Sequence, residues 1–178
     1  MSERFEFTEL SISGLYLIER KPIEDARGTF IRFFCAEELR CVGFKGSIAQ
    51  MNFTLTKRKG TVRGMHFQES PYSEQKIVTC LSGKIFDVAV DLREDSPTYL
   101  NWHAEILSET NGRSLFIPKG FAHGFQTLVP NCRLLYVHSE FFTPEAEGGL
   151  SYDDPKLAIK WPEKISFVSE RDKIHPKI

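Results

Sequence analysis

Two histidines and one tyrosine, on separate strand-like segments, are the side chains best suited to acid–base chemistry in this sequence. His66 lies in the segment 61–68, His123 in 120–125, and Tyr136 follows Leu135. An imidazole titrates near neutral pH and a phenol stays protonated there, so these types offer a base and an acid. On its own, a histidine among apolar neighbours is more typical of a hydrogen-bonded core residue. A small β-barrel that brings the three strands together would favour a reactive pocket.

The segment 61–68 has the alternation of a β-strand, which predicts two faces. Val62, Gly64, His66 and Gln68 are expected on one face, and Arg63, Met65 and Phe67 on the other. This pattern therefore separates the cation from the imidazole.

Short strands at near-regular spacing, separated by turn residues, dominate the rest of the chain. We expect strands at 15–19, 29–34, 47–56, 61–68, 75–81, 84–92, 99–107, 114–117, 124–129 and 133–142. One short helix is expected at 36–42, stopped by Gly43. The pattern predicts an all-β sandwich or barrel, in one domain that covers residues 1–178.

Composition narrows the classes of function. The formal net charge of the 178 residues is -1, which gives no basis for expecting nucleic acid or an anionic membrane as a partner. No apolar run approaches the roughly 20 residues that cross a bilayer. The four cysteines are scattered without a Cys-x-x-Cys pair, which is typical of reduced thiols in a cytoplasmic protein.

Several short motifs, none distinctive alone, follow one another in a recognisable order. They are Arg-Gly-Met-His-Phe-Gln at 63–68, Lys-Ile-Val at 76–78, Phe-Asp-Val-Ala-Val-Asp-Leu-Arg at 86–93, Ser-Pro-Thr at 96–98, Ile-Pro-Lys-Gly-Phe-Ala-His-Gly-Phe at 117–125 and Leu-Tyr at 135–136. Together they resemble the dTDP-4-dehydrorhamnose 3,5-epimerase family over most of the chain. The resemblance implies a cupin-type jelly roll and a homodimer that exchanges N-terminal strands. It also implies a nucleotide-linked 4-keto-6-deoxysugar as substrate, and no cofactor.

The sequence contains one of the two motifs that are typical of cupins. Gly112, Pro118, Gly120 and His123 match the spacing of the second cupin motif, Gly-x5-Pro-x-Gly-x2-His. The first cupin motif normally adds further histidines and a glutamate to a metal site, whereas the corresponding region here offers only His66. Two imidazoles without a third ligand make a poor site for a first-row metal, so we expect a metal-free cupin.

The reaction that the resemblance implies is inversion of carbons next to a ketone, through an enolate. It needs a base, an acid on the opposite face of the sugar and a positive charge at the enolate oxygen. By resemblance, His66 is the base, Tyr136 is the acid and Lys76 neutralises the oxygen. Asp172, in the Ser-x-x-Asp element at 169–172, would fix the tautomer of His66 and stabilise its imidazolium form.

The binding residues also follow from the resemblance. Arg63 would assist at the enolate end or hold phosphate, and His123 would contact the sugar. Arg27 would reach the diphosphate of the ligand bound by the partner subunit, as a bidentate guanidinium can. The further binding positions are Arg32, Gln50, Asn52, Phe142, Glu147 and Arg171, of which Gln50 and Asn52 face the nucleotide.

The nucleotide end departs from the family pattern. Arg32 stands where glutamate is common, Met51 and Phe53 replace aspartate and histidine, and Val137 replaces lysine. Phe142 takes the place of a tyrosine that stacks on thymine, and a phenyl face stacks about as well. These changes leave dTDP, CDP or another nucleotide as the carrier. They also leave open whether carbon 3, carbon 5 or both are inverted.

Other functions share part of this residue set. A cupin 3,4-ketoisomerase also enolises its substrate, but the combination of Tyr136, Lys76 and the Arg63–His66 motif favours an epimerase. A non-catalytic sugar- or nucleotide-binding cupin would not need His66, Tyr136 and Asp172 together. A metal-dependent dioxygenase is the least favoured, for want of ligands.

Overall fold

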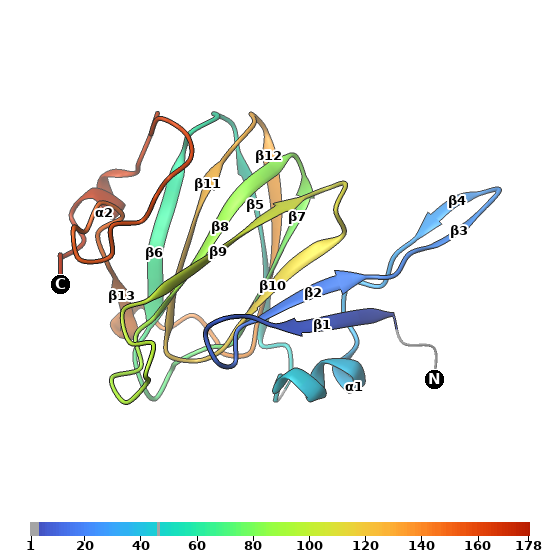
Figure 1. The fold of residues 1–178 in the computed structure, drawn as a ribbon, viewed down its shortest axis with the longest axis horizontal. Helices are drawn as coiled ribbons and strands as arrows, with labels where there is room; N and C mark the ends of the chain where they lie inside the picture. Colours follow the sequence, from blue (N-terminus) through green and yellow to red (C-terminus); the bar gives the residue numbers. More distant parts are fainter. Residues whose placement is uncertain (1–3, 46) are drawn as a thin grey trace.

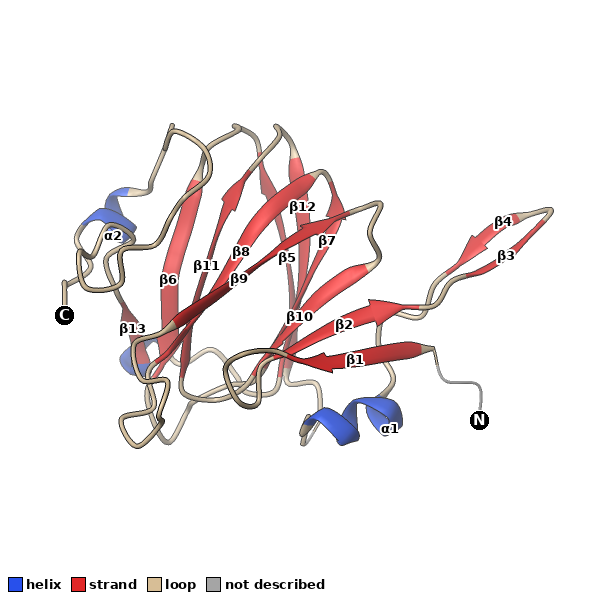
Figure 2. Ribbon diagram, viewed as in Figure 1, coloured by secondary structure: helices blue, strands red, loops and turns tan. Residues whose placement is uncertain are grey.

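The computed structural model describes residues 4–45 and 47–178 and consists mainly of two antiparallel sheets (Figures 1 and 2). The first sheet has the order β1 (Phe5–Glu9), β2 (Tyr16–Arg20), β10 (Arg113–Ile117), β7 (Lys76–Ser82), β12 (Cys132–His138) and β5 (Gln50–Thr56). The second has the order β13 (Glu147–Gly149), β6 (Val62–Gln68), β11 (Phe121–Thr127), β8 (Lys84–Asp91) and β9 (Trp102–Ser108). The expectation of an all-β, cupin-type jelly roll is confirmed.

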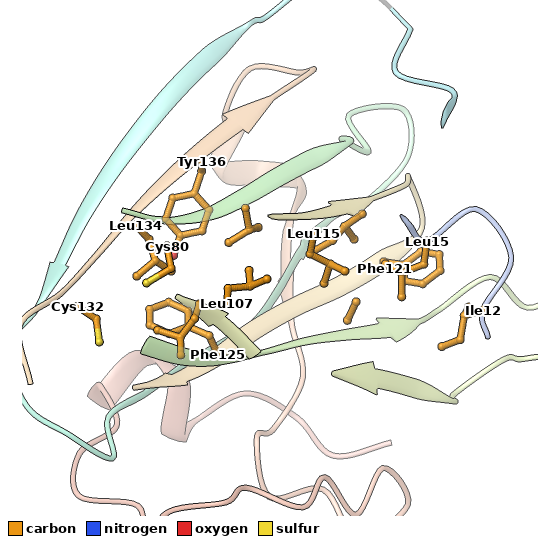
Figure 3. Packing of buried hydrophobic residues seen from close by; sticks show 14 residues of the cluster. Ile12, Leu15, Cys80, Leu107, Leu115, Phe121, Phe125, Cys132, Leu134 and Tyr136 are labelled. Carbon is orange, nitrogen blue, oxygen red and sulfur yellow. The ribbon is translucent and has the colours of Figure 1, made fainter. Parts of the chain in front are cut away.

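The space between the two sheets holds the main apolar core. Alternation along β7 turns Val78 and Cys80 into this core, beside Tyr136 of β12 and Phe125 of β11 (Figure 3). Burial of each large apolar side chain contributes about 1.5–3 kcal/mol to stability. The ring of Tyr136 is therefore held by the core.

The outer face of the first sheet is covered by the only segment expected to be helical. That segment forms α1 (Ala36–Leu39) and the 3-10 helix η1 (Arg40–Val42), and it ends at Gly43, whose φ of 87° suits glycine. Leu39 and Phe44 pack there against Ile77 and Phe116. The shorter helices are η2 (Pro144–Ala146) and α2 (Glu170–Lys173). Among residues 4–45 and 47–178, none of the helices has the length and apolar character needed to cross a membrane.

Some expected strand boundaries were wrong. Of the strand expected at 29–34, only the part up to Phe30 forms: β4 (Gly28–Phe30) pairs with β3 (Ile23–Asp25) in a short hairpin that projects away from the two sheets (Figure 1). The strand expected at 99–107 begins at Trp102, and the one expected at 133–142 ends at His138. Strand β1 was not expected; it pairs with β2, and Phe5 supplies its most buried side chain.

An irregularity in β6 overturns the predicted separation of Arg63 and His66. His66 pairs with His123, but Arg63 pairs with Phe125, so three steps on β6 match two on β11. The extra residue has the effect of a β-bulge, which breaks the strict alternation of side chains. Gly64 permits the close approach: its φ is 114°, and a Cβ there would lie 2.6 Å from the Cα of Gly124. Arg63 and His66 therefore both line one cleft.

Candidate active site

A cleft of about 910 Å³ takes side chains from β5, β6, β7, β11 and β12 and from the segment 167–172. It brings together eleven of the thirteen predicted site residues. They are Gln50, Asn52, Arg63, His66, Lys76, His123, Tyr136, Phe142, Glu147, Arg171 and Asp172.

His66 and Asp172, 106 positions apart in the chain, form a hydrogen-bonded pair at one side of the cleft. The Nε2 atom of His66 lies 2.9 Å from Oδ1 of Asp172. Ser169 caps α2 by accepting a hydrogen bond from the Asp172 N–H, and the N–H of Gly64 donates to the other carboxylate oxygen at 3.1 Å. Two elements thus fix the carboxylate before any ligand arrives.

The charge on Asp172 determines which nitrogen of His66 can act as the base. Burial opposes the ionisation of Asp172, but hydrogen bonds from His66 and Gly64 outweigh it and lower the pKa of Asp172 to about 2. An ionised carboxylate can only accept a hydrogen bond, so Nε2 of neutral His66 carries the ring hydrogen and the lone pair lies on Nδ1. With 32% of its side chain exposed, His66 can present that lone pair to a substrate.

Lys76 belongs to a buried charged group at the inner end of the cleft. Its Nζ lies 2.9 Å from Oε1 of Glu74, and Nδ1 of His138 lies 2.7 Å from Oε2 of the same carboxylate. Burial opposes the ionisation of Glu74, yet the bond from His138 and the charge of Lys76 keep its pKa below the usual range. Lys76 also donates to the carbonyl oxygen of His66 at 3.4 Å. The ammonium is therefore fixed near His66.

Tyr136 and His123 complete the inner end. Burial raises the pKa of the Tyr136 phenol, and the charge of Asp87 adds to that effect, so the phenol is a neutral proton donor at neutral pH. The rings of Tyr136 and His123 meet edge-on, with centroids 6.1 Å apart. Nε2 of His123 lies 2.8 Å from Oδ1 of Asp87, a fully buried carboxyl whose pKa is raised by burial.

The other predicted binding residues line the rest of the cleft. Arg63 donates from Nε to Oγ1 of Thr56 at 3.0 Å. The Gln50 side chain accepts a hydrogen bond from the N–H of Phe142 at 2.9 Å, and Phe142 is 52% exposed. The Asn52 amide lies 3.4 Å from Nε2 of His138, and Arg171 forms an ion pair with Glu147.

Two predicted residues lie away from this cleft. Arg27 stands at the turn of the β3–β4 hairpin, where it binds Asp25 and is 90% exposed. Arg32 pairs with Glu38 of α1 at 2.7 Å. Arg27 was assigned to a site in a partner subunit, so its place in one chain does not test that role. Arg32 is not brought to the cleft of its own chain.

The sequence reasoning missed Glu74, Asp87 and His138, which contact predicted site residues, and His175, which lies beside the His66–Asp172 pair without a hydrogen bond to it. Asp87 could have been found, because a carboxylate inside the apolar segment 86–90 needs a buried partner. Glu74 sits in a polar loop and His138 near a strand end, positions where charged residues are usually exposed. His175, close to Asp172, gives no distinguishing pattern.

Comparisons with known proteins identify the family of this chain. The sequence profile described as dTDP-4-dehydrorhamnose 3,5-epimerase matches residues 9–178. The chain belongs to the dTDP-4-dehydrorhamnose 3,5-epimerase family. The enzyme of that name from Sinorhizobium fredii is 40% identical over 173 residues, which cover 97% of this chain and 89% of the relative.

Other members of the family extend the comparison. The crystal structure of a dTDP-4-dehydrorhamnose 3,5-epimerase from Bacillus anthracis, with TDP and PPi bound, has a TM-score of 0.94. It is 37% identical, and the match covers 98% of this chain and 99% of that one. A dTDP-4-dehydrorhamnose 3-epimerase from Streptomyces niveus is 36% identical over 92% of this chain and 79% of its own length. The predicted isomerase class, that of a nucleotide-sugar epimerase, is thereby confirmed.

Proposed function

We propose that the protein inverts carbon 3, carbon 5 or both in a nucleotide-linked 4-keto-6-deoxyhexose. The observation that carries this proposal is the shared cleft of the His66–Asp172 pair, the neutral Tyr136 phenol and the Lys76 ammonium. Base, acid and cation are the three groups that inversion next to a ketone requires.

In the proposed reaction, Nδ1 of His66 removes the proton from the carbon beside the C4 ketone. Asp172 stabilises the resulting imidazolium through Nε2–H, over the 2.9 Å contact. Negative charge develops on the ketone oxygen, where Lys76, assisted by Arg63, stabilises the enolate. Tyr136 then donates its phenolic proton to the opposite face of the same carbon, which inverts it. His123 holds the sugar.

For the carrier we propose a nucleoside diphosphate with dTDP as the first choice. The support is that the Bacillus anthracis relative contains TDP and that Phe142 presents an exposed phenyl face at the rim. Gln50 and Asn52 lie on β5 and line the same cleft, and the ion pair of Arg171 with Glu147 would open to admit phosphate. CDP stays the alternative carrier.

Two of the possible outcomes have a counterpart among the relatives. Double inversion is supported by the 3,5-epimerase relatives, and inversion at carbon 3 alone by the Streptomyces niveus relative. One base and one acid serve either outcome, because the position of the sugar decides which hydrogen reaches His66.

We further propose that the chain works as a homodimer with exchanged N-terminal strands, as one domain, in the cytoplasm. The projecting β3–β4 hairpin, with Arg27 at its tip and an exposed Phe30, is suited to reach a second copy. Met51 and Phe53 are exposed on the edge strand β5 and give a surface that a partner would cover. Free cysteines, two of them buried, support a reducing compartment.

Proton NMR in deuterated water tests the function directly. The protein is mixed separately with the dTDP and CDP forms of 4-keto-6-deoxyglucose, and the C3 and C5 signals are followed. Loss of both signals with one carrier establishes a double epimerase and its nucleotide, and loss of one signal establishes a monoepimerase. No exchange with either carrier would overturn the proposal.

A further inference from the structure

A second cluster of ligating side chains lies beside the proposed base. One ligand atom from each of His66, Asp172 and His175 lies within 4.8 Å of the other two. We propose that these three residues form an inhibitory site for a divalent transition-metal ion of the Zn²⁺ type, which withdraws His66 from proton transfer. The inhibition rests on the proposed function, whereas the binding of the ion does not. The site is distinct from a resident metal cofactor, which we do not expect.

The state of His175 is the first argument for this site. Its Nε2 atom is buried and has no hydrogen-bond partner within residues 4–45 and 47–178. That atom lies 3.8 Å from Oδ1 of Asp172, too far for a hydrogen bond. A buried nitrogen without a partner costs about 1–3 kcal/mol, so such a group in a folded protein calls for an explanation. A bound cation would supply the missing partner.

The surroundings hold His175 where a ligand is needed. Its imidazole meets that of His66 edge-on, with centroids 5.6 Å apart. Gly149 of β13 makes room for the ring, since a Cβ there would collide with it. Burial lowers the pKa of His175, and the nearby His66 adds to the effect, so the imidazole stays neutral and able to coordinate a metal.

Asp172 is oriented as a metal ligand would be. Its Oδ2 atom accepts the Gly64 N–H, and Oδ1 is left facing both imidazoles. Such outer hydrogen bonds fix the direction of a ligating carboxylate and raise the affinity of a metal site. The residue is already ionised at neutral pH because its pKa is about 2.

Two imidazoles and one carboxylate suit zinc and its neighbours in the first transition series. Ligand atoms about 2.1 Å from one zinc ion lie about 3.4 Å apart in a tetrahedral arrangement. The cluster, within 4.8 Å, needs only a small contraction to reach that spacing. The contraction would come from the segment that carries His175, which follows the C-cap of α2, Ile174. With three protein ligands, a tetrahedral ion keeps a fourth position for water.

Binding of the metal ion at this site would prevent His66 from acting as the base. Nε2 of His66, which now contacts Asp172, would coordinate the ion, and the ring hydrogen would move to Nδ1. Nδ1 then has no lone pair for the hydrogen of the sugar. No net proton needs to leave the site, because the neutral imidazole only changes tautomer.

Calorimetric titration of the EDTA-dialysed full chain with Zn²⁺ alone tests the binding, and deuterium exchange on the keto-sugar tests the inhibition. We expect one zinc per chain, and exchange that zinc suppresses and EDTA restores. His175→Leu, which keeps much of the side-chain volume, is expected to weaken zinc binding at least about tenfold while its metal-free exchange stays within about twofold of wild type. His103→Leu removes an imidazole from β9 and is the matched control, with wild-type binding.

The outcomes separate this inference from the proposed function. Absence of zinc binding to the wild type, or equal zinc affinity in the wild type and a folded His175→Leu, would overturn the metal site. If His175→Leu unfolds, His175→Gln replaces it, and the same loss of affinity is expected. Zinc binding that depends on His175, in a protein without exchange activity on either carrier, would keep the metal site and reject the epimerase.

Discussion

The inner end of the cleft is built from buried charged groups, whereas its outer rim is built from exposed ones. At the inner end, Lys76, Glu74 and His138 are each 9–10% exposed at the side chain and are joined by contacts of 2.7–2.9 Å. At the rim, Phe142 and the side chain of Arg171 are each 52% exposed. The inner groups are thus positioned before a ligand binds, and the rim groups are free to adjust.

This difference separates chemistry from recognition. A buried charge that loses its partner costs several kcal/mol, so the inner groups tolerate little change. An ion pair at the rim such as Arg171–Glu147 contributes about 0–1 kcal/mol and would open at small cost for the proposed phosphate. Changes at the inner end should therefore lower kcat, and changes at the rim should raise KM.

Removing the proposed base is expected to have the largest effect on activity. His66→Ala should lower deuterium exchange at carbons 3 and 5 at least about 10³-fold, since a positioned base contributes about 10²–10⁴-fold. Proton NMR in deuterated water measures the loss. His103→Ala is the control and should exchange like the wild type, because this imidazole lies on β9 and contacts Glu105 of the same strand. Exchange at the wild-type rate in His66→Ala would end the assignment of the base.

Removing the proposed acid should separate two steps of the reaction. Tyr136→Phe keeps the ring in the core and removes only the proton donor, so deprotonation by His66 continues. We expect inversion to fall about 10²-fold while exchange stays within about tenfold of wild type. Product stereochemistry and isotope content, read from the same NMR sample, check this. Tyr72→Phe, at an exposed loop tyrosine, is the control. Equal losses of inversion and exchange would contradict the division of roles.

The ionisation of Asp172 should also affect the free energy of unfolding. Its pKa of about 2 lies below the usual value near 3.9, so ionised Asp172 stabilises the fold above about pH 4. This contribution is lost as the pH falls through the folded pKa. Asp172→Asn should therefore lower the free energy of unfolding by about 1–2 kcal/mol at pH 7, and the difference should shrink toward pH 2.

Urea unfolding at several pH values measures this difference. Asp95→Asn, at an exposed carboxylate between β8 and β9, is the control and should cost little at any pH. A destabilisation by Asp172→Asn that is the same at pH 3 and pH 7 would show that the loss does not come from ionisation.

The sequence pattern predicted the strands better than it predicted the positions of the site residues. Alternation and turn residues predicted most strands, because each strand has one face in the core. They misplaced Arg63 relative to His66, since the bulge depends on the partner strand β11 and on the contact of Gly64 with Gly124. The resemblance, and not periodicity, indicated Tyr136 and Asp172.

The missed residues share a physical cause. Glu74 is buried only because Lys76 and His138 converge on it, and His138 comes from a strand far along the chain. His175 matters only through its proximity to His66, which depends on how the C-terminal segment folds back on β6. Such long-range contacts cannot be predicted from local sequence. An isolated acid in an apolar strand, such as Asp87, can be recognised, because its burial requires a partner.

A substitution at the rim is expected to have the smallest effect on activity, and it tests whether the rim acts only in substrate binding. Phe142→Ala should raise KM for the nucleotide sugar about tenfold with kcat within about twofold, because stacking of a base on an aromatic ring contributes about 1–3 kcal/mol. Phe142→Tyr should restore KM. Phe141→Ala is a matched control, because this neighbouring ring is 66% exposed and is not part of the cleft lining. Initial rates with the dTDP and CDP forms give both constants. A fall in kcat with KM unchanged would mean that Phe142 acts in the chemical step, and that the division between an inner chemical end and an outer recognition end does not hold.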